Sequence, residues 1–207
     1  AIPLGVIAGA NPQTKLSKGI MAGSIFGISL PSFWMGMMLI YVFSVSLQIL
    51  PASGRAAAGP GGFSFLTPGG WKNLIMPVLT LALGYSATIL RVTRAGIQEN
   101  MKQDYVKFAR AKGVSRRNVL FHHALKNALV PVVTVFGLNI GHMFAFTTVT
   151  ETIFAWPGVG KLLIDSILRN DRPIIVAYLI LVSAMFVVIN FVVDIIYMLV
   201  DPRIELR

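Results

Sequence analysis

The chain has 207 residues, of which 55% are apolar and only 13% are charged. Soluble domains contain about a quarter charged residues, so water is a poor solvent for most of this surface. The absence of cysteine excludes disulfides, thiolate metal ligands and cysteine nucleophiles. The net charge of +10 accompanies long uncharged runs, a pattern typical of membrane topology, and no nucleic-acid partner is expected.

Four long runs lack Asp, Glu, Lys and Arg: residues 19–54, 73–90, 127–150 and 173–193. As a helix, the shortest run rises about 27 Å, enough to cross the hydrocarbon layer. Backbone groups in lipid must pair internally, so each run predicts a helix. Turn residues at 51–54 predict that the first helix ends near Leu50. Residues 1–10 are apolar but too short to span, and we expect them to be the end of a longer helix.

Basic residues are concentrated in residues 11–18, 91–126 and the C-terminal tail. The positive-inside rule places these segments in the cytoplasm. The opposite segments, about 51–73 and 151–172, are then outer loops. The first of these is rich in Gly and Pro and predicts irregular structure. The second contains a Trp-Pro-Gly turn followed by apolar residues at helical spacing, which predicts a short helix at the membrane surface.

Glycine pairs four residues apart recur in the apolar runs. Such pairs allow close helix packing, although membrane helices are also generally rich in glycine. The pairs are Gly5 with Gly9, Gly23 with Gly27, and Gly137 with Gly141.

No catalytic or metal-binding motif is found. Residues 158–162 depart from a phosphate loop because Ala155 replaces its first glycine and Leu162 its Ser or Thr. The histidines fall at different levels of the membrane, so we expect no metal site, and no catalytic triad occurs. Asn139 and His142 share a helix face inside a span. They can bond neighbouring helices or line a substrate path, and we identify them as candidate path residues.

The cytoplasmic segment, about residues 91–126, is the most distinctive. Residues 97–112 contain no Gly or Pro, and the helical period puts Tyr105, Phe108 and Ala109 on one face. Gly113 predicts a left-handed helix end, and Ser115 predicts the cap of a second helix. A basic helix lying on lipid is one interpretation. The sharp turn and the small Ala109 favour a docking surface for a soluble protein.

Residues 104–113, Asp-Tyr-Val-Lys-Phe-Ala-Arg-Ala-Lys-Gly, resemble the cytoplasmic loop of the integral membrane permeases of bacterial ABC importers, in particular of their peptide and nickel branch. Residues 123–131, 151–160 and 201–203 resemble further motifs of that branch. The chain departs from the general permease loop, which opens with Glu-Ala-Ala where this sequence has residues 107–109.

The resemblance implies an all-α membrane protein: a polytopic helical bundle of the type I importer permease fold, lacking the first helix, with residues 1–207 as a single transmembrane domain. It also implies a multi-pass protein of the bacterial inner membrane that imports di- or oligopeptides. Coupling to an ATPase would fall to the loop residues Asp104, Tyr105, Phe108, Ala109, Ala111, Lys112 and Gly113.

The implied partners are a second, homologous permease subunit, two cytoplasmic ATP-binding subunits that hydrolyse ATP, an external solute-binding protein and membrane lipid. This chain itself would hold no cofactor. A nickel or other small-solute importer of the same branch is an alternative. A proton-coupled secondary transporter would need carboxylates near the middle of the membrane, and the uncharged runs contain none.

Overall fold

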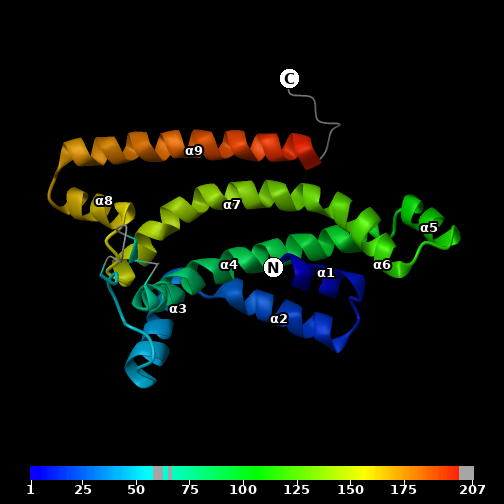
Figure 1. Ribbon diagram of the computed structural model, residues 1–207, viewed down its shortest axis with the longest axis horizontal. Helices are drawn as coiled ribbons and strands as arrows, with labels where there is room; N and C mark the ends of the chain where they lie inside the picture. The colour runs from blue at the N-terminus through cyan, green and yellow to red at the C-terminus, as the bar shows by residue number, and fades with distance from the viewer. Residues whose placement is uncertain (58–62, 65–66, 201–207) are drawn as a thin grey trace. The chain divides into compact units, whose positions relative to one another are not determined.

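The computed structural model describes residues 1–57, 63–64 and 67–200, which form helices and loops with no strand among them (Figure 1). The all-helical prediction is therefore confirmed. Residues 201–203, which carry the last of the resembling motifs, and residues 58–62 of the first outer loop lie outside the described residues. The helices are α1 (Ile2–Ala10), α2 (Lys15–Ser29), α3 (Ser32–Leu39), the π-helix η1 (Ile40–Ser46), α4 (Pro68–Asn100), α5 (Asp104–Ala111), α6 (Arg116–Asn118), the π-helix η4 (Val119–Leu125), α7 (Lys126–Ile153), α8 (Val159–Leu168) and α9 (Arg172–Val200).

The chain divides into two compact units. The first contains residues 1–29, 85–140 and the chain from Val188 onward, and the second contains residues 30–84 and 141–187. Helices α4, α7 and α9 contribute to both units. The single transmembrane domain expected from the sequence stays a prediction.

Within the described residues, three helical stretches are long and apolar enough to cross a membrane: Gly69–Asn100, Arg116–Met143 and Arg172–Val193. They correspond to the last three uncharged runs. Residues 15–29 and 32–46 pass the same test only when taken together, which gives up to four spans. The chain is therefore a multi-pass membrane protein.

The first uncharged run is not the single helix to Leu50 that the sequence predicted. It breaks before Pro31, whose φ of −58° and ψ of 139° are extended, and its last helical turn ends at Ser46. Proline has no N–H to donate, and its ring forces the preceding residue away from helical geometry. The break therefore follows from Pro31, which the count of charges ignored.

Helices run into the segments predicted as loops. Helix α4 begins at Pro68 and continues to Asn100, well past the charged Arg91 and Arg94, and α7 begins at Lys126. The predicted boundaries of 51–73 and 91–126 were drawn from charge, but a charged side chain does not end a helix. The connection between α4 and α7 therefore comprises residues 101–125. The positive-inside rule predicts that it is cytoplasmic, and it is called the cytoplasmic segment below.

Close helix packing at glycines is confirmed for two of the three pairs. In the first unit, a Cβ on Gly5 would lie 2.6 Å from Thr93 Cβ, and one on Gly9 would lie 2.8 Å from Ile97 Cβ, so α1 is pressed against α4. Gly137 of the first unit meets Val193 at 2.6 Å, and Gly141 of the second unit meets the Phe186 ring, so α9 packs on α7 in each unit.

The core of the first unit surrounds the contact between α1 and α4. Val6, Ile97, Ala124 and Ala128 are buried together there. Partly buried apolar side chains extend the cluster toward the cytoplasmic segment, namely Ile2, Met101, Leu120 and Leu125. The cytoplasmic segment is therefore built directly onto the core of the first unit.

We predict that Gly9→Leu lowers the thermal unfolding midpoint of the detergent-solubilised protein. The new side chain would collide with Ile97 and with the backbone oxygen of Arg94, and such overpacking costs roughly 1–3 kcal/mol. Gly23→Leu is the matched control, because nothing lies within 4 Å of a Cβ at Gly23. Equal midpoints for the two variants would contradict the packing of α1 on α4.

Candidate functional site

The cytoplasmic segment folds as predicted around its glycine turn. Two residues after the end of α5, Gly113 has a φ of +80°. The N–H groups of Gly113 and Val114 donate to the carbonyls of Arg110 and Ala109, respectively. This is the Schellman pattern, which favours glycine at the left-handed position. The Ser115 side chain then accepts the N–H of Asn118 and caps α6, as the sequence predicted.

The inner face of α5 packs on η4. Val106, Ala109 and Val119 are buried together, with Met101 and Val114 partly buried against them. The helical period predicts one face for Tyr105, Phe108 and Ala109, but Ala109 is only 8% exposed whereas Phe108 is 62% exposed. The small methyl of Ala109 instead permits the close approach of α5 to η4.

The outer face of α5 presents one large apolar side chain among charges. Lys112 Nζ lies 4.5 Å from the centre of the exposed Phe108 ring. Lys107 pairs with Asp104 at 2.8 Å, and its hydrogen bond and charge lower the pKa of the Asp104 carboxyl below its ordinary value. This exposed ion pair adds little stability. Ala111 and Gly113 are exposed beside this face.

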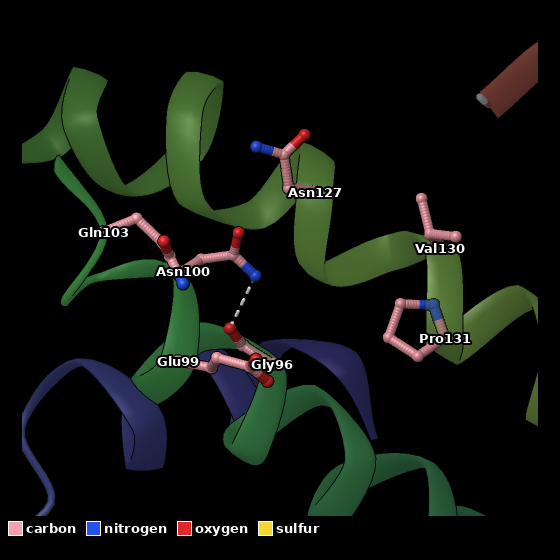
Figure 2. A pocket seen from close by; sticks show the side chains of 7 residues that line it. All are labelled: Gly96, Glu99, Asn100, Gln103, Asn127, Val130 and Pro131. Atoms are coloured by element: carbon pink, nitrogen blue, oxygen red, sulfur yellow. Dashed lines mark hydrogen bonds between the residues drawn. The ribbon is translucent and has the colours of Figure 1, made fainter. Parts of the chain in front are cut away.

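Tyr105 joins α5 to the ends of two long helices. Its hydroxyl donates to Asn100 Oδ1 at 2.6 Å and accepts from Asn127 Nδ2 at 3.0 Å. Asn100 Nδ2 in turn donates to the carbonyl of Gly96 at 2.8 Å, the bond drawn in Figure 2. Asn100 is the last residue of α4 and Asn127 is the second residue of α7. The Tyr105 hydroxyl therefore connects α4, α5 and α7.

These amides border an open polar pocket of about 350 Å³ (Figure 2). Its walls come from the end of α4, the start of α7 and the turn between α4 and α5. The lining residues are Gly96, Glu99, Asn100, Gln103, Asn127, Val130 and Pro131. A displacement of α5 would therefore be transmitted to both walls of this pocket. Sequence reasoning missed Asn100 and Asn127, because only the fold brings them to Tyr105.

A third attachment runs from α6 to the turn between α1 and α2. The Arg116 guanidinium donates to Asn11 Oδ1 and, at 3.4 Å, to the carbonyl of Ala10. The cytoplasmic segment is therefore held at α4, at α7 and at the α1–α2 turn, all within the first unit.

The two candidate path residues lie in α7. Asn139 Nδ2 is buried and has no hydrogen-bond partner within the described part of the chain. His142 is exposed. Within the described residues, Asn139 Nδ2 therefore makes no hydrogen bond to a neighbouring helix.

In the segment predicted to be an outer loop, the second unit contains a helix cap formed by a side chain ten residues away. Glu151 Oε2 accepts the N–H of Lys161 at 2.8 Å, and Glu151 is 9% exposed. A Cβ on Gly158 would overlap the Glu151 carboxylate, and one on Gly160 would lie 2.6 Å from Thr148 Cα. The glycines thus admit the carboxylate to the N-terminus of α8, where the helix dipole favours a negative charge. The short helix predicted in residues 161–168 is confirmed as α8.

These features define a class: a multi-pass helical membrane protein whose cytoplasmic connection is a packed helical projection with an exposed aromatic residue. Comparison with known families agrees. Residues 1–206 match the model of the binding-protein-dependent transport system inner membrane component. The chain belongs to this family, and it is a multi-pass inner membrane protein.

Similar proteins carry peptide-transport names. The di/tripeptide transport system permease protein DppB of Pseudomonas aeruginosa is 44% identical over 97% of this chain and 64% of its own length. The oligopeptide transport system permease protein AppB of Bacillus subtilis is 40% identical over 99% and 64%. The glutathione transport system permease protein GsiC of Escherichia coli is 41% identical over 98% and 62%. The chain therefore spans less than two thirds of the length of each of these relatives.

We predict that Tyr105→Phe loosens α5 without unfolding the bundle. The substitution removes two hydrogen bonds, each contributing about 0.5–1.5 kcal/mol, and leaves the buried face of α5 intact. Hydrogen exchange of the α5 amides should accelerate about tenfold, while the thermal midpoint changes little. Tyr41→Phe in η1 is the control for loss of a hydroxyl. Unchanged exchange in α5 would show that the bridge does not hold the segment.

We also predict that Gly160→Ala destabilises the outer side, because neither the backbone of Thr148 nor the capping carboxylate can give way cheaply. Glu151→Gln should cost less, about 0.3–1 kcal/mol, since the amide keeps an acceptor but loses the charge at the helix N-terminus. Protease cleavage after Lys161 reports the opening of α8. Gly69→Ala is the control, since nothing lies within 4 Å of a Cβ there. Equal cleavage of all three variants would contradict the cap.

Proposed function

We propose that this chain is the permease part of an ATP-driven importer that carries di- or oligopeptides across the cytoplasmic membrane. The family match and the peptide-transport names of the relatives support this function. The observation that carries the proposal is the cytoplasmic segment: an exposed Phe108 on a helix that is bonded to α4 and α7 through Tyr105.

The proposed partners are a second, homologous permease subunit, two cytoplasmic ATP-binding subunits and an external solute-binding protein. In this scheme the ATP chemistry belongs to the ATP-binding subunits, and this chain contributes no cofactor and no catalytic residue. The outer face of α5 docks on an ATP-binding subunit. When the two ATP-binding subunits close on ATP, α5 moves and pulls on the ends of α4 and α7 through the Tyr105 bridge.

The path through the membrane needs neutral donors and acceptors for a peptide backbone. The Asn139 amide has an N–H with no partner among the described residues, and this N–H could donate to a peptide carbonyl once helix movement exposes it. Asn139 is therefore the stronger of the two proposed path residues, and His142 is the second.

The function is tested with the full-length protein, its partner subunits and its solute-binding protein reconstituted in proteoliposomes. We expect ATP-dependent uptake of radiolabelled di- or oligopeptides and ATP hydrolysis that rises when the loaded binding protein is added. Uptake of nickel instead of peptides would replace the peptide assignment with the nickel alternative. Uptake driven by a proton gradient in the absence of ATP would refute the importer class.

We predict that Phe108→Ala weakens association with the ATP-binding subunits about tenfold, as expected for loss of a large aromatic contact. Phe121→Ala is the matched control, because Phe121 is a similarly exposed phenylalanine (47%) on η4 rather than on α5. Association is measured by titrating purified ATP-binding subunits onto the permease in nanodiscs. Similar affinities for the two variants would remove α5 from the docking surface.

We predict that Asn139→Leu lowers peptide uptake several-fold without lowering the thermal midpoint, because Nδ2 has no hydrogen bond to lose. His142→Leu should likewise lower peptide uptake without lowering the thermal midpoint. Asn190→Leu in α9 is the control for amide removal within a span. Loss of stability in proportion to the loss of uptake would show that Asn139 bonds helices together and does not line a path.

A further inference from the structure

A second cavity of the first unit gathers positive charge. It has a volume of about 710 Å³ and lies among the α1–α2 turn, the start of α2, the end of α4 and α5. Four of its lining residues are basic and none is acidic. The complete lining is Gly9, Ala10, Pro12, Gln13, Lys18, Arg94, Gln98, Met101, Lys102 and Arg110.

The described residues lining this cavity include no acid to balance its cations. Among the described residues, none of its four cations takes part in an ion pair. Of the nearby acids, Asp104 pairs with Lys107, and Glu99 lines the other pocket, beside Tyr105. Four like charges around one cavity repel each other, so an anion bound there would be strongly favoured.

Arg94 provides an independent sign of a missing ligand. Its Nε atom is buried and has no hydrogen-bond partner in the part of the chain that the structure describes. A buried donor on a charged group without an acceptor costs free energy unless a ligand completes it. Arginine presents N–H groups in a fork that matches the oxygens of a phosphate.

The position of the cavity indicates which anion is available. Lys18 and Arg94 lie at the start of α2 and near the end of α4, which the charge distribution places at the cytoplasmic membrane boundary. Phosphates of anionic lipids lie at that boundary, and basic pockets between transmembrane helices on that side bind such headgroups. The volume is also within the range of about 300–1,000 Å³ typical of ligand sites.

We propose that this cavity binds the phosphate group of an anionic phospholipid from the cytoplasmic leaflet, with Arg94, whose Nε is buried, as its inner ligand and the exposed Lys18, Lys102 and Arg110 around its rim. Because Arg110 lies on α5, the bound lipid also connects the cytoplasmic segment to α2 and α4. The proposal does not depend on which solute the protein transports.

The test uses the full-length protein in its assembled transporter, stripped of lipid and titrated with phosphatidylglycerol under native mass spectrometry. K18Q/R94Q should bind this lipid about 25-fold more weakly, since each basic residue near an anionic surface contributes about a fivefold effect. K15Q/R91Q is the matched control: it removes the same two charges from the same two helices, and neither residue lines the cavity. Equal weakening in both double variants would overturn the proposal.

A second double variant distinguishes weaker lipid binding from a folding defect. Lys102 and Arg110 are exposed, so K102Q/R110Q leaves the buried structure intact and should still weaken phosphatidylglycerol binding. Full lipid binding by K102Q/R110Q together with misfolding of K18Q/R94Q would overturn the proposal.

Two further arms distinguish other anions. Inorganic phosphate is titrated by calorimetry: binding that depends on Lys18 and Arg94, with phosphatidylglycerol binding unaffected, would identify a soluble anion and overturn the lipid assignment. The ATP-binding subunits retained on purification are also measured. If K18Q/R94Q lost its ATP-binding subunits but bound phosphatidylglycerol normally, the cations would face acidic residues of a subunit. This result would also overturn the proposal.

Discussion

The contact between α5 and η4 is the interaction on which the cytoplasmic side depends. Val106 and Ala109 press on Val119, and this apolar contact turns a connection between two long helices into a small folded unit. Because Ala109 is small, the α5 backbone comes close enough for Tyr105 to reach Asn100 and Asn127. The apolar contact sets the position of α5, and the hydrogen bonds fix it to the helices that cross the membrane.

This arrangement suits the transmission of force better than a flexible loop would. The outer face of α5 is free for a partner, because Phe108 is exposed and the charges around it are paired or stacked locally. The segment is attached to the bundle at three places, and each attachment leads to a different part of the first unit. A partner that moved α5 would therefore move the ends of α4 and α7 with it.

In the second unit, a single carboxylate caps the N-terminus of α8. Helix α8 follows a tight Trp-Pro-Gly turn, and its first N–H groups need an acceptor. Glu151, at the end of α7, supplies that acceptor from ten residues away, and the glycines at 158 and 160 leave the space for it. Both features lie in a chain that belongs to the binding-protein-dependent transport system inner membrane component family.

The sequence by itself determined the membrane class, the last three spans, the glycine turn at Gly113, the cap at Ser115 and the short helix after Pro157. These depend on local properties, namely hydrophobic length, backbone conformation and capping, which act between residues close in the chain. The break at Pro31 was equally local and could have been predicted from proline alone.

Only the tertiary structure decided which residues meet across the fold. The burial of Ala109, the bridge from Tyr105 to Asn100 and Asn127, and the reach of Glu151 to Lys161 join separate elements. The same is true of the basic cavity, because its cations come from α2, α4, α5 and the turn between α4 and α5. Helical periodicity gives the direction of a side chain around its own helix, but it cannot tell which neighbour that side chain will face.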